Sequence, residues 1–576
     1  MNGAQALVQM LIAYETQVVF GLPGDTSVDF YDALGAETSR IRHIMARDER
    51  SAGFMADVYA RLSGKPGICE GPSGGGASYL LPGVVEAHGS SVAMIALTTD
   101  NPLNYEAQGA LTDLDQQQIY RAVTKWTALV KSADVLPHFI RRAFRLATSG
   151  RPGAVHLSLP KNVQREEIVS PVHMHAEKDC MAWPSHRTRP DPEAVSRAAQ
   201  KLWNAERPII VAGGGVVSSG AFDELSAISK LLNAPVTTTI NGKGAMAETH
   251  PLCLGVIGAN GGRPYAAQAV QEADLVLFVG TKANYVNTDT WRLPSLENPP
   301  TILQIDVDPA ELGNTYPIDV GMCGDARLAL TDLRDALEEI RQSPPGRDTW
   351  LNGINRDKSA WRAQIERSAS SWTGQISSQQ VIQELNRSLP EETILVSDPG
   401  TTTPFISAGF ELSQPGRRII IPRAQGGLGY AIPGVVGARL ARPDLPIVGV
   451  FGDGSFAMSA GDLATVARVG GPTILILFNN SCFGWIKTLQ NINYAGRYFS
   501  VDFPEAINYV DIAKGFGLRA ILIHEPDEIG PAVKNALSSG EPSFFEVKIP
   551  PQYEEIPPVA PWQKAFAARR DKSIGK

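Results

Sequence analysis

The sequence predicts an α/β protein of three doubly wound domains, each a parallel sheet covered by helices. The chain has 576 residues, which is too many for one hydrophobic core. Apolar runs of buried-strand length alternate with helical patterns along most of it. Two linkers separate the domains: 166–192, which has no periodicity, and 343–375, which begins with Ser343-Pro-Pro-Gly and continues as a polar helix. The predicted units are residues 1–165, 193–342 and 376–550, followed by a tail at 551–576.

Composition and charge exclude several classes of function. The net charge is -8 and basic runs are missing, so we expect neither nucleic acid nor an anionic membrane as partner. Apolar runs stay below membrane-spanning length, and Glu15 interrupts the apolar N-terminal stretch where a signal peptide would be uncharged. Five scattered cysteines without a CxxC pair favour a reducing compartment. We therefore predict a soluble, cytoplasmic protein.

The first domain begins with a short strand at 18–20 that runs into the turn Gly21-Leu-Pro-Gly-Asp25. A second strand is expected at 41–45. From Glu49 onward, apolar residues recur at helical spacing, which places Glu49 in the first turn of a helix. A solvated acid favoured by the helix dipole is the usual interpretation of such a residue.

The first linker contains His173-x-His175, which we interpret as part of a solvated loop, since a third metal ligand is missing nearby. The middle domain follows, with strands expected at 208–212, 236–240, 275–280 and 302–307. Gly213-Gly214-Gly215 follows the first of these strands, but the sequence has no GxGxxG fingerprint. A nucleotide-binding domain of Rossmann type and an empty structural domain both remain open.

The third domain carries the most informative stretch. An apolar strand at 446–451 ends in Gly452-Asp453-Gly454, and after a helix a second buried strand, 473–478, ends in Asn479-Asn480. Open α/β sheets bind ligands at the carboxyl ends of their strands. A carboxylate and an amide oxygen meeting there suit a hard divalent cation, which can also hold a diphosphate.

This pattern, GDG followed by about 25 residues and NN, resembles the thiamine-diphosphate-binding motif. The resemblance implies that Asp453, Asn480 and the backbone carbonyl of Cys482 hold Mg²⁺, which holds the diphosphate of thiamine diphosphate. It also implies that the Gly426 carbonyl receives the 4′-amino group and that Leu428 wedges beneath the coenzyme. The alternatives are that Leu428 is an ordinary core leucine and that the GDG sequence occurs here by chance. The other expected coenzyme contacts are Gly400, Thr401, Thr402, Gly452, Gly454, Ser455, Phe483 and Gly484, and Trp485, Ile486 and Leu489 are expected to line the substrate pocket.

The first domain resembles the amino-terminal domain of acetolactate synthase and its relatives, through Gly21–Asp25 and the stretch around Glu49. The resemblance implies that Glu49 protonates the aminopyrimidine ring, which helps the coenzyme to lose its C2 proton. Asp25 stands where many carboligases have a small residue, and a carboxylate there would suit proton delivery to substrate. Thr112 replaces the Gln of a segment that often reads FQE, so the role of that Gln stays open.

The resemblance covers nearly the whole chain and implies an assembly. The first and third domains look alike, and in this superfamily the coenzyme lies between the first domain of one subunit and the third of another. A homodimer at least, and a homotetramer by analogy, is expected. The middle domain binds FAD in acetolactate synthase and ADP or CoA in oxalyl-CoA decarboxylase and its relatives. The C-terminal tail would be a lid or a frayed terminus.

We therefore predict a thiamine-diphosphate- and Mg²⁺-dependent lyase or carboligase that makes or breaks a carbon–carbon bond of a 2-oxo acid. An acetolactate-synthase-like carboligase or decarboxylase is the first interpretation. A 2-hydroxyacyl-CoA lyase or an enzyme similar to oxalyl-CoA decarboxylase, acting on an acyl-CoA, is the alternative. A non-catalytic nucleotide-binding paralogue is the alternative from another class.

Overall fold

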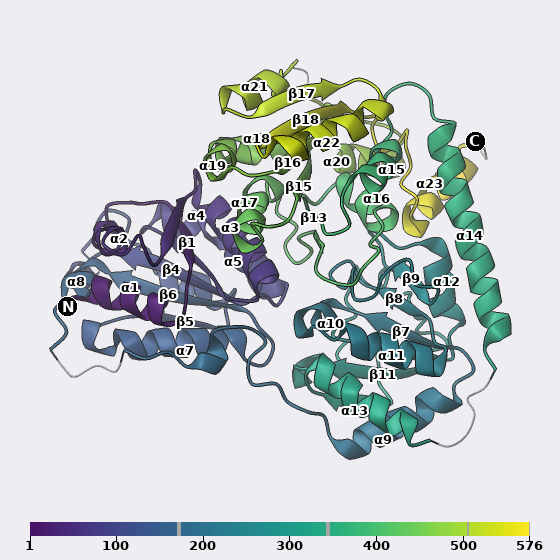
Figure 1. The fold of residues 1–576 in the computed structure, drawn as a ribbon, viewed down its shortest axis with the longest axis horizontal. Helices are drawn as coiled ribbons and strands as arrows, with labels where there is room; N and C mark the ends of the chain where they lie inside the picture. Colours follow the sequence, from purple (N-terminus) through teal and green to yellow (C-terminus); the bar gives the residue numbers. More distant parts are fainter. Residues whose placement is uncertain (107, 170–173, 341–345, 504–505, 575–576) are drawn as a thin grey trace.

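Three parallel sheets of six strands each form the framework of the chain (Figure 1). The structure is a computed structural model and describes all residues except 107, 170–173, 341–345, 504–505 and 575–576. His173 lies outside the described residues. The α/β class predicted from the alternating patterns is confirmed, because every strand pairing within the three sheets is parallel.

The first sheet has the strand order β2-β1-β3-β4-β6-β5. Its strands are β1 (Val18–Gly21), β2 (Arg42–Met45), β3 (Gly67–Gly71), β4 (Met94–Asp100), β5 (Trp126–Leu129) and β6 (Ala154–Pro160). The helices around it are α1 (Gly3–Ala13), α2 (Val28–Gly35), α3 (Glu49–Ser63), α4 (Gly75–Tyr79), α5 (Leu81–Gly89), α6 (Gln116–Arg121), α7 (Leu136–Thr148) and α8 (Lys161–Arg165). Both faces of the sheet are therefore covered, which is why β1, β3 and β6 consist only of buried residues.

The third sheet has the order β14-β13-β15-β16-β18-β17, the same permutation as the first sheet. Its strands are β13 (Ile394–Ser397), β14 (Ile419–Ile420), β15 (Ile447–Gly452), β16 (Thr473–Asn479), β17 (Arg519–Ile523) and β18 (Ser543–Lys548). Its helices are α15 (Ser378–Ser388), α16 (Thr402–Gly409), α17 (Ala431–Ala441), α18 (Asp453–Ser459), α19 (Leu463–Val469), α20 (Gly484–Asn493), α21 (Tyr509–Gly515) and α22 (Ile529–Ser539). The predicted similarity of the first and third domains is confirmed.

The first and third domains pack together through α3 and α17, which occupy equivalent positions in the two folds. A Cβ on Gly437 would lie 2.1 Å from the Met55 carbonyl oxygen, so glycine is what allows this close approach. Arg61 of α3 forms buried ion pairs with Asp57 at 3.0 Å and with Glu86 at 3.4 Å. The Tyr430 hydroxyl donates to Asp57 and ties the two domains together.

The middle sheet has the order β12-β11-β10-β7-β8-β9, which is the strand order of a Rossmann fold. Its strands are β7 (Pro208–Ala212), β8 (Val236–Thr238), β9 (Cys253–Val256), β10 (Leu275–Val279), β11 (Thr301–Asp306) and β12 (Val320–Cys323). Its helices are α9 (Pro192–Asn204), α10 (Gly214–Ser219), α11 (Phe222–Leu232), α12 (Pro264–Glu272) and α13 (Ala326–Glu338). The Rossmann-like middle domain is thus confirmed, and its strand order reverses between β7 and β10.

Several predicted strands end earlier than expected. The strand predicted at 275–280 ends at Val279, because Gly280 adopts a left-handed φ of 58°. The strand predicted at 236–240 ends at Thr238, where Thr239 N donates to Ala212 O and leads into a turn. Asp306 ends β11, since its carboxylate accepts a hydrogen bond from Asp308 N.

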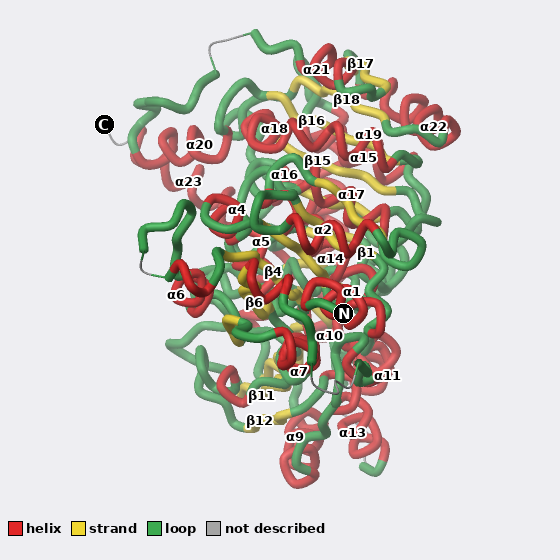
Figure 2. The backbone as a smooth tube through the Cα atoms, turned by 90° about the vertical axis from the view of Figure 1, so that its left-hand side faces the viewer, coloured by secondary structure: helices red, strands yellow, loops and turns green. Residues whose placement is uncertain are grey.

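Two long helices lie outside the three sheets. The second linker contains α14 (Asp348–Ser370), and the C-terminal tail contains α23 (Ala560–Ile574). In Figure 2, α23 lies beside α20, and the Trp562 ring packs edge-on against Trp485 with the centroids 4.6 Å apart. Among the described residues, no helix is both long and apolar enough to cross a membrane.

Candidate active site

A cavity of about 380 Å³ opens at the carboxyl edge of the third sheet. Its walls come from the loops after β13, β15 and β16, from the segment before α17, and from one loop of the middle domain. The lining residues are Asn260, Pro399, Gly400, Thr401, Arg423, Gly426, Leu428, Gly452, Asp453, Gly454, Ser455, Phe478, Asn480, Cys482, Phe483, Gly484, Trp485 and Ile486. The strand ends that the sequence singled out therefore meet in one cavity.

Asp453 begins α18 directly after β15 and is 2% exposed. One carboxylate oxygen accepts from Gly454 N at 2.8 Å and the other from Asn480 N at 3.2 Å, which joins the two motif segments. Burial raises the pKa of Asp453 to about 6, although hydrogen bonds from backbone N–H groups oppose this effect. Among the described residues, Asp453 forms no ion pair with a cationic side chain. A buried, uncompensated carboxylate beside an amide oxygen fits a divalent cation.

Glycines make room for this arrangement. A Cβ on Gly484 would lie 2.6 Å from Asn480 Nδ2 and 2.7 Å from Thr401 Oγ1, and one on Gly454 would lie 2.6 Å from the Phe483 ring. Larger residues would displace the polar groups that face the cavity. The close packing therefore fits a site that brings backbone and small polar groups up to a ligand.

Two predicted pocket residues do not line the cavity. Thr402 is buried, and its hydroxyl donates to the Asp398 carbonyl at 2.8 Å. Leu489 lies one turn beyond Trp485 and Ile486 on α20 and is 37% exposed. Both follow predicted pocket residues in sequence, but the Thr402 hydroxyl is bonded to the Asp398 carbonyl, and Leu489 lies one turn farther along α20 than the residues that line the cavity.

Asp398 fixes the backbone at the start of α17. Its carboxylate accepts from the backbone N–H groups of Gly429, Tyr430 and Ala431 at 2.8 to 2.9 Å. Burial raises the pKa of Asp398 to about 6. Leu428 is partly exposed and faces the cavity, so the alternative of a core leucine is not what the structure shows.

The three predicted catalytic residues of the first domain gather around the glycine-rich loop at 71–76. Glu49 starts α3 and is 8% exposed, so the solvated interpretation does not hold. A Cβ on Gly76 would lie 3.0 Å from its Oε1. Thr112 Oγ1 lies 2.7 Å from Ser73 Oγ. Asp25 is exposed and follows Gly24, which packs so closely against Pro72 that a Cβ would not fit.

Burial raises the pKa of Glu49, and the neighbouring Asp48 charge adds to this effect. A carboxyl with a raised pKa keeps its proton at a higher pH than an ordinary glutamate. Glu49 is thus suited to donate a proton. Within the part of the chain that the structure describes, none of residues 1–165 lines the 380 Å³ cavity of the same chain.

A second buried acid, Glu70, lies near the end of β3. The Tyr31 hydroxyl donates to Glu70 Oε2 at 2.6 Å and lies 3.1 Å from His43 Nε2. Burial raises the pKa of Glu70 from 4.5 to about 8. The folded protein therefore binds a proton at Glu70 in a pH range where the unfolded chain has lost it.

Stability should fall as pH rises between about 4.5 and about 8, because in that range the unfolded chain has released the Glu70 proton while the folded state still binds it. Glu70→Gln removes this titration. We expect the melting temperature of the variant relative to the unmodified protein to rise from about pH 5 to about pH 8 and to level off above that pH. Thermal unfolding across that range measures it, with exposed Glu206→Gln as the matched control. A difference that stays constant with pH would contradict the prediction.

A second cavity, of about 160 Å³, lies at the switch point of the middle sheet. Gly214, Gly215 and Gly280 line it, and a Cβ on Gly215 would lie 2.7 Å from the Gly280 Cα. Residues 89–91 and 150–152 of the first domain close its other side. The position is where doubly wound sheets bind nucleotides.

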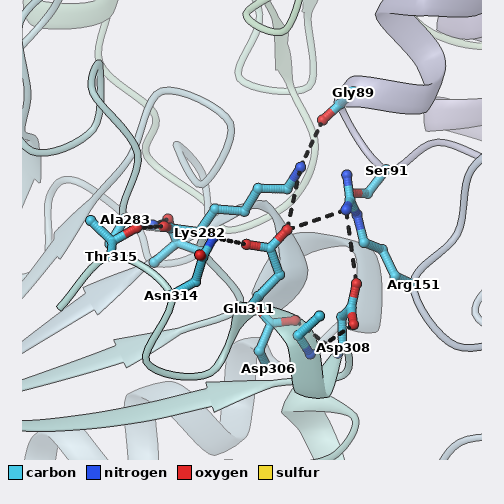
Figure 3. A network of polar contacts seen from close by, with 12 residues as sticks. Gly89, Ser91, Arg151, Lys282, Ala283, Asp306, Asp308, Glu311, Asn314 and Thr315 are labelled. Atoms are coloured by element: carbon cyan, nitrogen blue, oxygen red, sulfur yellow. Dashed lines mark hydrogen bonds and ion pairs between the residues drawn. The ribbon is translucent and has the colours of Figure 1, made fainter. Parts of the chain in front are cut away.

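Figure 3 shows the polar network beside this second cavity, in which Arg151 and Lys282 both turn toward Glu311. Arg151 lies 3.2 Å from Glu311 and 3.9 Å from Asp308, and Lys282 lies 3.7 Å from Glu311. Lys282 also donates to Gly89 O at 3.5 Å. The network thus joins the first and middle domains, and its cations already have acidic partners.

The polar residues of the larger cavity that sequence reasoning missed are Asn260 and Arg423. Asn260 comes from the middle domain, in the Gly258–Gly262 loop, where a Cβ on Gly261 would lie 2.4 Å from the Ser407 Cβ. The cluster of glycines around Asn260 was the only local signal. Arg423 precedes the predicted Gly426 by three residues and carried no motif.

Fold and site together define a class of protein. Two α/β domains of equal topology flank a Rossmann-type domain, and one of them carries a cavity suited to a cation and a diphosphate. This is the architecture of a coenzyme-dependent α/β enzyme. Family models identify the coenzyme. The thiamine pyrophosphate enzyme N-terminal TPP binding domain matches residues 1–119, the central domain matches 195–333, and the C-terminal TPP binding domain matches 398–547.

Curated relatives match almost the whole chain. The probable acetolactate synthase large subunit of Methanococcus aeolicus is 33% identical over 97% of this chain and 94% of its own length. That of Methanocaldococcus jannaschii is 34% identical with the same coverage, and acetolactate synthase isozyme 3 large subunit of Escherichia coli is 30% identical over 93% and 92%. The chain belongs to the thiamine pyrophosphate enzymes, in the family that includes these acetolactate synthase large subunits. It is a thiamine-diphosphate-dependent enzyme.

Proposed function

We propose that this enzyme is a Mg²⁺-dependent carboligase that joins the acyl part of one 2-oxo acid to a second carbonyl compound. The observation that carries the proposal is the meeting of Asp453 and Asn480 in one cavity at the carboxyl edge of the third sheet. Relatives named acetolactate synthase over almost the full chain support the 2-oxo acid as substrate.

The roles of the chain's own residues follow from their positions. When bound, thiamine diphosphate supplies a nucleophilic carbon and an electron sink for decarboxylation. Asp453, Asn480 and the carbonyl of Cys482 would hold Mg²⁺, while Gly400, Thr401, Gly452, Gly454 and Ser455 would bind the diphosphate through backbone and hydroxyl groups. The Gly426 carbonyl and the Leu428 side chain would orient the ring system. Phe483 and Gly484 border the same space, and Trp485 and Ile486 restrict access of water.

Glu49 would complete the site from a second copy of the chain. Asp453, the proposed cation ligand, is the only acid among the described residues that line the cavity of one chain, and the first domain presents a buried Glu49 at a glycine-rich edge. We therefore propose a homodimer as the smallest active unit, and a homotetramer as a pair of such dimers. In that assembly, Asp25 and Thr112 would stand near the substrate, because they share the loop at 71–76 with Glu49.

The smaller cavity would hold a nucleotide cofactor, FAD or ADP. Its place at the switch point of a Rossmann-type sheet and its glycine lining support this proposal. Denaturing the purified protein and identifying the released compound tests it. Released flavin favours the interpretation as an acetolactate-synthase-like enzyme. Released ADP, together with a saturable effect of acyl-CoA esters on activity, favours the acyl-CoA alternative.

The proposed reaction is tested with purified protein, thiamine diphosphate, Mg²⁺ and pyruvate. We expect release of CO₂ together with acetolactate, both dependent on coenzyme and metal. Sedimentation at the assay concentration should show a dimer or larger assembly. Coenzyme-dependent turnover by a monomer, or lack of CO₂ release from any simple 2-oxo acid, would refute the proposal.

A further inference from the structure

Arg423 stands in the wall between the two cavities. It lines both the 380 Å³ cavity of the third domain and the 160 Å³ cavity of the middle domain. Among the described residues that line the larger cavity, it is the only Arg or Lys, and Asp453 is the only acid. The charged groups of that cavity are therefore one acid, which suits the cation, and one guanidinium.

The guanidinium of Arg423 has no partner within the described chain. No hydrogen bond or ion pair of its side chain is formed, and its Nε is buried without an acceptor. Burial lowers the pKa of Arg423. An unpaired, partly buried cation destabilises the fold unless an anion binds to it. Arg151 and Lys282 of the smaller cavity differ from Arg423 in this respect, because both pair with Glu311.

The acid whose charge acts on Arg423 is Glu86 of α5, and its carboxylate is already engaged. Its Oε1 accepts from the backbone N–H groups of Arg423 and Ala424 at 3.0 and 3.2 Å, and its Oε2 accepts from those of Gln425 and Gly426 at 2.7 and 3.3 Å. Ser90 Oγ and Arg61 also donate to Oε1. Glu86 thus fixes the backbone of residues 423–426 and so sets where the Arg423 side chain begins, but it does not pair with the guanidinium.

An anion in the larger cavity is the partner that the proposed function supplies. A 2-oxo acid that serves as donor loses its carboxylate as CO₂, so a fixed cation on that group would stabilise the ground state against the reaction. An acceptor acid keeps its carboxylate. The new bond joins the donor's carbonyl carbon to the acceptor's carbonyl carbon, the acceptor's carbonyl oxygen takes up a proton, and the acceptor's carboxylate is unchanged.

We propose that Arg423 binds the carboxylate of the acceptor and thereby makes the enzyme select a 2-oxo acid over an aldehyde as second substrate. The inference rests on the proposed function. It identifies Arg423 as a specificity-determining residue, with charge-assisted hydrogen bonds from the guanidinium to the carboxylate.

The test is a competition between two acceptors for the same donor. Pyruvate serves as donor, and pyruvate and acetaldehyde compete as acceptors, giving acetolactate and acetoin. In Arg423→Met we expect the acetolactate to acetoin ratio to fall about 10- to 100-fold, the range of one charge-assisted hydrogen bond. Arg423→Lys should restore part of the ratio, and exposed Arg356→Met should leave it unchanged. Because the ratio is set after donor decarboxylation, partial loss of coenzyme or of folded protein does not change it.

A binding measurement separates this inference from the proposed function. Oxamate, an unreactive analogue of a 2-oxo acid, should bind Arg423→Met about 10- to 100-fold more weakly than the unmodified protein. An unchanged product ratio or unchanged oxamate affinity overturns the assignment of Arg423. If Arg423→Met binds FAD or ADP more weakly while its product ratio is unchanged, the assignment is also wrong. The guanidinium then belongs to the nucleotide cavity. Absence of CO₂ release by the unmodified protein counts against the proposed function, and the oxamate comparison then decides on Arg423.

Discussion

Replacing Glu49 by glutamine should reduce turnover by about 10²- to 10⁴-fold, the usual share of a general acid or base. Glutamine keeps the volume of the side chain, which is 8% exposed beside Gly71 and Gly76, so the fold should persist. It removes the ionisable proton of the Glu49 carboxyl, whose pKa burial raises above the ordinary glutamate value. Steady-state kinetics of CO₂ release measure the loss.

Coenzyme binding separates loss of chemistry from loss of the site in this variant. Trp485 lines the cavity, so quenching of its fluorescence should report binding of thiamine diphosphate. We expect the dissociation constant of Glu49→Gln to stay within about threefold of the unmodified value, since Asp453 and Asn480 are untouched. Glu206→Gln, an exposed acid of the middle domain, is the matched control for both measurements. Full activity of Glu49→Gln would rule out the role given to this residue.

Replacing Asp453 by asparagine should abolish metal-supported binding of the coenzyme. The asparagine oxygen can still accept from Gly454 N, as the carboxylate does at 2.8 Å, but the charge that attracts a divalent cation is lost. We expect the dissociation constant of thiamine diphosphate in the presence of Mg²⁺ to rise by about 100-fold or more, equivalent to about 3 kcal/mol for one charged ligand. Titration calorimetry at fixed Mg²⁺ measures it.

The control for Asp453→Asn is Asp444→Asn in the same domain, which removes an exposed acid paired with Arg442. Its coenzyme affinity should be unchanged. A second check is the metal dependence, since the remaining binding by Asp453→Asn should respond weakly to Mg²⁺. Unaltered Mg²⁺-dependent affinity in Asp453→Asn would mean that the cation binds elsewhere.

Much of the larger cavity followed from the sequence because its walls follow strand ends. In a parallel sheet the carboxyl ends of strands meet at one edge, so Asp453 after β15 and Asn480 after β16 had to come together. Thr402 and Leu489 show the limit of this reasoning. Each lies close in sequence to residues that line the cavity, yet the Thr402 hydroxyl is bonded to the Asp398 carbonyl, and Leu489 lies one turn farther along α20.

Residues that reach the cavity from distant segments could not be predicted in this way. Asn260 depends on how the middle domain packs against α16, and Arg423 depends on Glu86, which lies more than 300 positions earlier in the chain. The burial of Glu49 and the raised pKa of Glu70 likewise arise from the packing of α2, α3 and the loop at 71–76. A one-dimensional pattern carries no signal for such contacts.

By itself the sequence determined the three α/β units, the Rossmann-like middle domain and the residues at the carboxyl ends of β15 and β16. These features are local, since hydrophobic periodicity sets each strand and helix, and glycines permit each turn. Only the tertiary structure decided that Arg423 stands unpaired between two cavities, that Glu86 holds the segment beside it, and that Glu49 is buried. The physical reason is that desolvation and charge pairing depend on which distant side chains come together, and that is settled only when the domains pack.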